Sequence, residues 1–257
     1  MRVVTLNCFL NPRSLTAGIR LRLIARELRL MAPDIILLQE VILKSCRRWL
    51  ERCLRSLGYR CYSEEGRWFT RGGLLTAARG VINRAEFTSF RNQGGLIGFV
   101  MGDAIMSKGC QRLEATIGSK RLILVNTHLL EHYGWENWRD RNSNLAAQVD
   151  EIKAFLQAVP AEANLLVGGD FNFSPSSRFY RQLIDGLELK DTVAERAAWD
   201  GTGKHYATHA DGRLDYIFYR GLDLGSTKSA LVFRAPLTIA RSKHYPSDHL
   251  GVMCEFG

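Results

Sequence analysis

Several features that define particular protein classes are missing from this chain of 257 residues. No apolar run approaches the roughly 18 residues that a membrane-spanning helix needs, so no transmembrane segment is predicted. The start, MRVVTLNCFLNPR, is too short in apolar length for a signal peptide. The six cysteines are scattered, without a CxxC or a paired spacing, which disfavours a disulfide framework and a zinc site. Together these absences predict a cytoplasmic protein with reduced thiols.

Segments that separate domains are absent as well. The chain has 6 prolines and no Pro/Gly/Ser-rich linker, low-complexity tract or internal repeat. Because 46% of its residues are hydrophobic, it can bury a large core. We therefore predict a single domain over residues 1–257, and we expect a monomer.

Acidic residues are outnumbered by basic ones. The 35 Lys and Arg residues against 26 Asp and Glu residues give a formal net charge of +9 and a pI near 9.4. This balance favours an anionic partner, which would be nucleic acid, an anionic lipid surface or a phosphorylated substrate. The alternative is a generically basic protein whose arginines are scattered over its surface.

Strand-like runs alternate with helical periodicity along the chain. The predicted helices span 16–31, 44–57, 145–158 and 177–185, and the predicted strands span 2–9, 35–38, 59–63, 73–79, 122–126, 164–169, 213–219 and 249–256. The order strand, helix, strand, with several late hairpin-like strands, predicts a mixed α/β fold with sheets inside and helices outside. The arginines of the second helix are expected to form a solvated face: Arg47, Arg48, Arg52 and Arg55.

The segment NLLVGGDFN, residues 164–172, carries the most specific chemical signal. A short apolar strand ends in two glycines, which would let the backbone bend and a ligand come close. Asp170 and Asn172 then stand at the carboxyl end of the strand, where ligand crevices open in α/β folds. In an extended stretch both would face one way, with Phe171 turned into the core. An Asx turn after a strand is an equally good interpretation of this segment alone.

Similar polar groups lie at or just beyond other predicted strand ends. They are Asn7, Glu40, His128, Asp215, Asp248 and His249. Each alone fits a turn, a solvated acid or a buried histidine. Several carboxylates in one crevice would repel one another and raise their pKa values, and a bound cation would remove that penalty. Oxygen ligands favour Mg²⁺ or Mn²⁺ over zinc.

The order of the motifs resembles that of the endonuclease/exonuclease/phosphatase superfamily, whose members are DNase I-like. The motifs are LNC at 6–8, LLQEV at 37–41, NTHL at 126–129, GGDFN at 168–172, RLDYIF at 213–218 and SDH at 247–249. This resemblance covers nearly the whole chain. It implies a four-layered α/β sandwich, with two central mixed β-sheets flanked by helices, in one catalytic domain. It also implies hydrolysis of phosphate esters with a divalent ion.

The resemblance assigns roles to the motif residues. Glu40 is expected to be the principal ligand of Mg²⁺, or of Mn²⁺ in its place, with Asn7 and Asp248 assisting. His249 is expected to take a proton from water and Asp215 to orient it.

The other motif residues are expected to act on the phosphoryl group. Asp170 would position the water or share in the removal of its proton, and Asn172 would hold a phosphoryl oxygen. His128 would steady charge or protonate the leaving oxygen on the other side of phosphorus. Such a division of roles suits in-line attack on a phosphodiester.

The closest likeness within the superfamily is to neutral sphingomyelinase-like enzymes. It is carried by Phe9 after LNC, GGLLTAAR at 72–79, GDAIMSKG at 102–109 and NTHLLEHYG at 126–134. Abasic endonucleases usually have an acid where Phe9 stands and a Tyr-Pro-Asn motif that this chain lacks. A sphingomyelin-like phospholipid is therefore the first predicted substrate. A DNase or RNase, or a phosphatase of a small phosphorylated molecule, is the alternative.

Two loops bear on the choice of substrate. Residues 94–101, GGLIGFVM, are apolar enough to touch a lipid interface. Tyr133, Trp135, Trp138 and Arg139 follow His128 and mix aromatics with a cation, as expected for binding a lipid headgroup or a nucleic acid base. The ordinary alternative is that these aromatics cap the core. Any membrane contact is expected to be peripheral.

Overall fold

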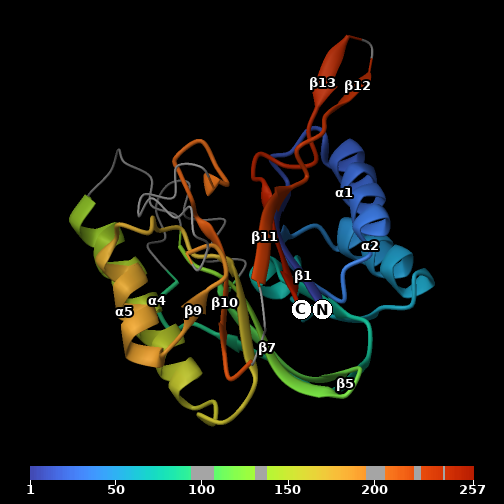
Figure 1. Ribbon diagram of the computed structural model, residues 1–257. Helices are drawn as coiled ribbons and strands as arrows, with labels where there is room; N and C mark the ends of the chain where they lie inside the picture. Colours follow the sequence, from blue (N-terminus) through green and yellow to red (C-terminus); the bar gives the residue numbers. More distant parts are fainter. Residues whose placement is uncertain (94–106, 131–137, 195–205, 223–226, 240) are drawn as a thin grey trace.

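The described strands of the computed structural model form two six-stranded sheets and one small hairpin. The structure describes residues 1–93, 107–130, 138–194, 206–222, 227–239 and 241–257. Figure 1 shows the sheets side by side in the middle of the molecule, with helices on both outer sides and the two chain ends together. This arrangement confirms the predicted four-layered α/β sandwich.

The first sheet contains both ends of the chain. Its strand order is β11 (Thr227–Val232), β14 (Gly251–Phe256), β1 (Arg2–Leu10), β2 (Ile35–Val41), β4 (Leu75–Ala78) and β3 (Arg60–Tyr62). β1 and β2 run parallel, whereas the other pairs are antiparallel. The parallel pair places the carboxyl ends of β1 and β2 at one edge of the sheet.

The second sheet has the same mixed character. Its order is β5 (Val81–Ser89), β6 (Gly109–Ile117), β7 (Lys120–His128), β8 (Leu165–Asp170), β10 (Asp215–Arg220) and β9 (Lys190–Asp191). Only β7 and β8 run parallel among these pairs. The ends of β7 and β8 therefore lie next to each other, and the antiparallel β10 begins beside them.

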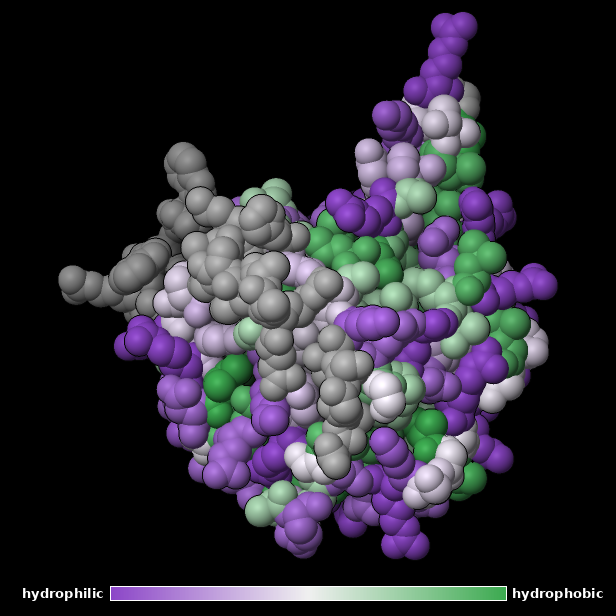
Figure 2. All heavy atoms as spheres, in the orientation of Figure 1, coloured by the Kyte–Doolittle hydropathy of each residue, from purple (hydrophilic) through white to green (hydrophobic). Residues whose placement is uncertain are grey.

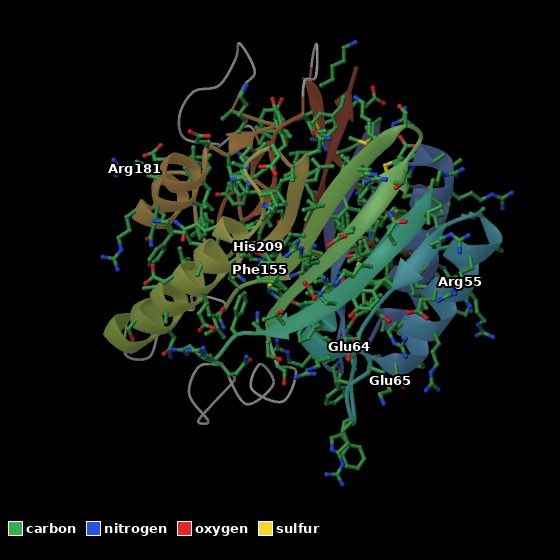
Figure 3. All side chains as sticks on the ribbon, turned by 90° about the horizontal axis from the view of Figure 1, so that it is seen from below. Arg55, Glu64, Glu65, Phe155, Arg181 and His209 are labelled. Atoms are coloured by element: carbon green, nitrogen blue, oxygen red, sulfur yellow. The ribbon has the colours of Figure 1, made fainter. Side chains whose placement is uncertain are left out.

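Three apolar layers hold the sandwich together. The helices α1 (Ala17–Met31) and α2 (Lys44–Ser56) pack on the first sheet, whereas α4 (Trp138–Gln157) and α5 (Arg178–Leu187) pack on the second. A third cluster fills the space between the sheets with side chains such as Leu37, Leu166 and Ile217. Figure 3 shows the outer layers from below, with Arg55 of α2 and Arg181 of α5 on opposite sides. The remaining elements are the short helix η1 (Arg71–Gly73) and the hairpin strands β12 (Leu237–Ile239) and β13 (Ser242–His244).

Most predicted elements appear within a few residues of their expected bounds, and the differences have local causes. α4 begins at Trp138, seven residues before the predicted start. β5 was not predicted because its side chains are exposed or only partly buried and show no apolar run. Arg47 was wrongly placed on a solvated face, since it is buried and donates to Glu51 and Ser63.

The glycines of β8 serve the packing of the protein itself. A Cβ atom at Gly168 would lie 2.5 Å from Cδ1 of Leu37 in the other sheet, and one at Gly169 would lie 2.0 Å from the carbonyl oxygen of Thr127 in β7. Neither position tolerates a side chain. These glycines therefore allow the close approach of the two sheets and of the neighbouring strand, and the predicted approach of a ligand stays a prediction.

Within the described residues, no helix is both long enough and apolar enough to cross a membrane.

Candidate active site

Strand register brings the predicted site residues of both sheets together. Asn7 lies near the end of β1 and pairs with Gln39, directly before Glu40. In the second sheet, Asp170 lies opposite His128 on one side and opposite Asp215 on the other. The sandwich therefore places five polar side chains at one edge, as the strand-end pattern predicted.

The amide of Asn7 connects the two sheets. Its Nδ2 donates to Oε1 of Glu40 at 3.0 Å and to Oδ2 of Asp170 at 2.9 Å. Its Oδ1 accepts from the backbone N–H of Phe9 at 3.1 Å, which fixes the orientation of the amide. Asn7 thus holds two carboxylates near each other.

Glu40 is positioned by a second amide that the sequence motifs did not single out. Nδ2 of Asn11 donates to Oε2 of Glu40 at 2.7 Å, and Asn11 is buried. Glu40 itself has a left-handed backbone, with φ of 52°. Such a conformation is unfavourable for a residue other than glycine and is typical of functional sites. The only sequence signal for Asn11 was its place four residues after Asn7.

His249 and Asp215 form a buried pair. Nδ1 of His249 lies 2.9 Å from Oδ2 of Asp215, and Nε2 lies 3.9 Å from Oδ2 of Asp170. Burial lowers the pKa of His249, but the carboxylates of Asp215, Asp170 and Asp248 outweigh it and raise that pKa to about 10. These carboxylates therefore favour the protonated form of His249.

Two neighbours missed by the sequence analysis support this pair. Thr208 Oγ1 accepts from the backbone N–H of Asp215 at 3.2 Å. The ring of His209, labelled in Figure 3, packs against that of His249 in a tilted arrangement, with 4.7 Å between their centroids. Both residues precede β10 in a segment whose sequence has no distinctive motif.

The surroundings of His128 lower its pKa, whereas those of His249 raise the pKa of that ring. Its Nε2 lies 3.6 Å from Oδ2 of Asp170 and 3.0 Å from Nζ of Lys108. Burial, the Lys108 ammonium and His249 lower the pKa of His128 well below its ordinary value. Lys108 is buried and also donates to the carbonyl oxygen of Leu129 at 2.7 Å. The GDAIMSKG motif contained Lys108, but the sequence alone gave it no role.

Asp170 is the centre of the cluster. Its carboxyl group is buried, and burial together with Asp215 raises its pKa to about 7. The backbone N–H of Asn172 donates to Oδ1 of Asp170 at 3.0 Å, and Asn172 has a φ of 54°. The segment thus forms an Asx turn and a polar site at once, with Phe171 in the core. Nδ2 of Asn172 donates to the carbonyl oxygen of Leu129.

Asp248 lies at the rim of the site. Its side chain is 38% exposed, and its Oδ1 lies 3.1 Å from the hydroxyl oxygen of Ser247. The same hydroxyl donates to the backbone oxygen of Asn7 at 2.6 Å, which ties the segment to β1.

The donor set fits a hard divalent cation. Asp215 Oδ1 is buried and forms no hydrogen bond with the described residues. Asp170, Asp215 and His249 have potential ligand atoms within 4.8 Å of one another, although His249 already bonds to Asp215. The predicted ligand Glu40 adjoins Asp170 through Asn7. The carboxylates therefore carry negative charge that a nearby cation would compensate.

The side chains of the predicted substrate loop lie outside the described part of the chain. Tyr133 and Trp135 lie outside the described residues. Trp138 and Arg139 begin α4, but their side chains are outside the described part of the chain.

The chain belongs to the Endonuclease/Exonuclease/phosphatase family, whose model matches residues 4–249. Nocturnin from Rattus norvegicus is 29% identical over 160 residues, which cover 57% of this chain and 36% of that protein. A 5′-tyrosyl-DNA phosphodiesterase from Caenorhabditis elegans is 26% identical over 258 residues, which cover 96% of this chain and 64% of that protein. The chain thus spans less than two thirds of each of these relatives.

Solved structures share the fold. Sphingomyelinase C from Streptomyces griseocarneus matches with a TM-score of 0.76 at 20% identity, covering 100% of this chain and 99% of that chain. A beta toxin mutant from Staphylococcus aureus with bound magnesium ions matches with a TM-score of 0.74 at 15% identity, covering 100% and 99%. These matches agree with the DNase I-like sandwich described above.

Proposed function

We propose that the protein is a divalent-metal-dependent phosphodiester hydrolase. The observation that carries the proposal is the convergence of Glu40, Asp170 and His249 from three separate motifs at one edge of the two-sheet sandwich, linked by Asn7 and Asp215. Family membership and the activities named for the relatives support it.

Asp170 is the carboxylate placed to accept a proton from the attacking water. With a pKa raised to about 7, it is a base of useful strength near neutral pH. Asn172 uses one amide N–H for the carbonyl of Leu129. Its second N–H is available to a phosphoryl oxygen.

The two imidazoles take different parts. The sequence-based assignment made His249 the base, but its raised pKa favours the protonated ring, which would stabilise charge or donate to the leaving oxygen. His128 is neutral beside Lys108, and the ammonium of Lys108 would offset the negative charge of the phosphoryl group.

Glu40 would hold the metal ion, with Asp248 assisting at the rim and Asn7 fixing the orientation of the Glu40 carboxylate. Mg²⁺ fits these oxygen ligands, and Mn²⁺ is the natural substitute. The magnesium in the beta toxin structure supports this choice. When bound, the ion would neutralise developing charge on the phosphoryl oxygens.

Removal of divalent ions is expected to stop turnover. With bis(p-nitrophenyl) phosphate and Mg²⁺, addition of EDTA should lower the rate at least about 100-fold, because the charge that the ion neutralises would be left uncompensated. Excess Mg²⁺ should restore the rate and thereby control for damage to the protein. Undiminished hydrolysis in EDTA would contradict the metal dependence.

A phospholipid is the first candidate substrate because of the hairpin formed by β12 and β13. Figures 1 and 2 show this hairpin projecting beyond the body of the molecule with hydrophobic and hydrophilic residues side by side. Leu237, Ile239 and Tyr245 are exposed, and exposed cations flank them at Arg241 and Lys243. Apolar side chains with adjacent cations suit a lipid surface. β13 leads within a few residues to Asp248 and His249, so a docked hairpin would bring the site to the lipid.

Polar substitution of the hairpin is expected to separate lipid hydrolysis from the chemistry itself. The double variant Leu237→Ser, Ile239→Ser should hydrolyse sphingomyelin vesicles at least about tenfold more slowly, because two apolar side chains no longer enter the lipid. Hydrolysis of bis(p-nitrophenyl) phosphate should stay at the wild-type rate. Leu30→Ser, on the exposed end of α1, is the matched control. Equal vesicle hydrolysis by wild type and double variant would contradict lipid docking.

A nuclease is the second candidate, favoured by charge. Exposed arginines line both helices of the first sheet: Arg22, Arg26 and Arg29 on α1, and Arg48, Arg52 and Arg55 on α2. Such a face attracts a phosphate backbone. Cleavage of plasmid DNA or single-stranded RNA, with sphingomyelin vesicles left intact, would identify this activity.

A further inference from the structure

Arg20 occupies the rim of the site without a complete set of partners. It lies in the first turn of α1, and its Nε donates to Thr16 Oγ1 at 3.3 Å. Its terminal Nη1 is buried and forms no hydrogen bond with the described residues. The nearest carboxylate oxygen, Oδ1 of Asp248, is 3.9 Å away, which is too far for a hydrogen bond. A buried guanidinium N–H without an acceptor is costly unless a ligand supplies one.

The aromatic ring of Phe9 holds this guanidinium in place. The Arg20 Cζ atom lies 5.0 Å from the centroid of the Phe9 ring, within the range of a cation–π contact. Phe9 sits in a bulge of β1, where the pairing with β2 shifts between Asn7 and Leu10. Its φ of 49° is unusual for a bulky residue and typical of functional sites. The backbone is therefore strained at Phe9, two residues after Asn7. In this conformation the Phe9 ring lies against Arg20.

The position of Arg20 relates it to the reacting groups. Asp248, its nearest acid, is the chain neighbour of His249, and Ser247 bonds to the backbone of Asn7. The acid nearest to the guanidinium is thus the sequence neighbour of His249. Arg20 therefore lies beside the proposed catalytic cluster and not inside it. Its side chain is 17% exposed, so one side can be reached from solvent. Guanidinium groups bind phosphate through paired, charge-assisted N–H donors.

We propose that Arg20, held on Phe9, binds a second phosphate of the substrate, next to the phosphodiester that is cleaved. This inference rests on the proposed phosphodiesterase activity and specifies its substrate class. The partner chemistry is a phosphodiester that carries a further phosphate within reach. A nucleic acid strand offers one phosphate for each nucleotide, and a phosphorylated inositol lipid offers one on its headgroup.

The test compares two chromogenic diesters that differ by one phosphate. They are thymidine 5′-(p-nitrophenyl phosphate) and its 3′-phosphorylated counterpart, assayed with Mg²⁺. For the wild type, the 3′-phosphate should raise kcat/KM about tenfold or more, mainly through KM. In Arg20→Gln this ratio should fall to about one, whereas Arg20→Lys should keep part of it. Arg22→Gln, an exposed arginine on the same helix, should show the wild-type ratio.

The outcomes separate this inference from the proposed function. A wild type that hydrolyses neither these diesters nor bis(p-nitrophenyl) phosphate nor sphingomyelin vesicles contradicts the phosphodiesterase activity itself. A wild type that hydrolyses both with equal kcat/KM overturns the second-phosphate site for nucleotides, and equal rates on vesicles of phosphatidylinositol and of phosphatidylinositol 4-phosphate overturn the site altogether. An Arg20→Gln variant that loses rate on both diesters but keeps the wild-type ratio also overturns it, because Arg20 would then act by positioning Asp248.

Vesicles of phosphatidylinositol and of phosphatidylinositol 4-phosphate form the lipid arm of the experiment. If the wild type prefers the 3′-phosphorylated nucleotide and Arg20→Gln does not, the second phosphate comes from a nucleic acid. If the wild type prefers phosphatidylinositol 4-phosphate and Arg20→Gln does not, the second phosphate comes from a lipid headgroup. No dependence on Arg20 in either pair overturns the proposal.

Discussion

Asp170→Asn is expected to lower kcat about 10²- to 10⁴-fold while leaving the fold intact. The amide has the shape of the carboxyl group, and its one oxygen can still accept the hydrogen bond from the backbone of Asn172, although the bond from Asn7 to the second oxygen is lost. It cannot accept a proton from water, and it removes the negative charge that faces both imidazoles. Steady-state hydrolysis of bis(p-nitrophenyl) phosphate measures the loss, and circular dichroism with urea unfolding measures the fold.

Asp185→Asn is the matched control for this variant, because Asp185 is an exposed acid on α5. It should retain the wild-type rate. His249→Ala should lose turnover as Asp170→Asn does, since His249 is the proton-bearing partner on the other side of the carboxylate. A rate near that of the wild type in either site variant would refute the assigned roles.

Arg213→Met is expected to lower the free energy of unfolding by about 3–5 kcal/mol. The Arg213 guanidinium donates twice to Asp191, at 2.8 and 2.6 Å, and neither side chain is exposed. Removal of the arginine leaves a buried carboxylate with only the hydroxyl of Tyr180 and the N–H of Val193 as partners. Urea denaturation gives the change in free energy.

Two controls make this stability prediction specific. Arg181→Met, an exposed position on α5 (Figure 3), should change the free energy of unfolding by less than about 0.5 kcal/mol. Adding Asp191→Leu to Arg213→Met should recover part of the loss, because the uncompensated charge is then gone. If Arg213→Met alone were as stable as the wild type, the Arg213–Asp191 pair at the start of β10 would contribute little to the free energy of unfolding.

The sequence pattern predicted which polar residues come together where those residues lie at the ends of paired strands. Parallel pairing of β1 with β2 and of β7 with β8 places Asn7 near Glu40 and His128 near Asp170, as strand-end residues of parallel pairs must be. The Asx turn at Asp170 and the polar site, which competed as interpretations, both exist, because the turn uses Oδ1 and the site uses Oδ2.

The sequence pattern did not predict the contacts between residues that lie far apart in the chain. Asn11 and Lys108 reach Glu40 and His128 from loops or strand starts without a periodic signal. His209 packs against His249 because its loop folds back onto the residue before β14, where the N–H of Leu250 donates to the carbonyl of Thr208. The roles assigned to the motif residues, the single domain, the monomeric state and the cytoplasmic location stay predictions.

Anomalous diffraction from crystals grown with Mn²⁺ tests the central claim most directly. The account predicts one manganese peak in contact with the Glu40 carboxylate and on the same side of the molecule as Asp170 and His249. In Glu40→Gln crystals this peak should weaken or disappear. Manganese bound only at a distance from Glu40 would contradict a shared site for the metal and the proposed phosphoryl chemistry.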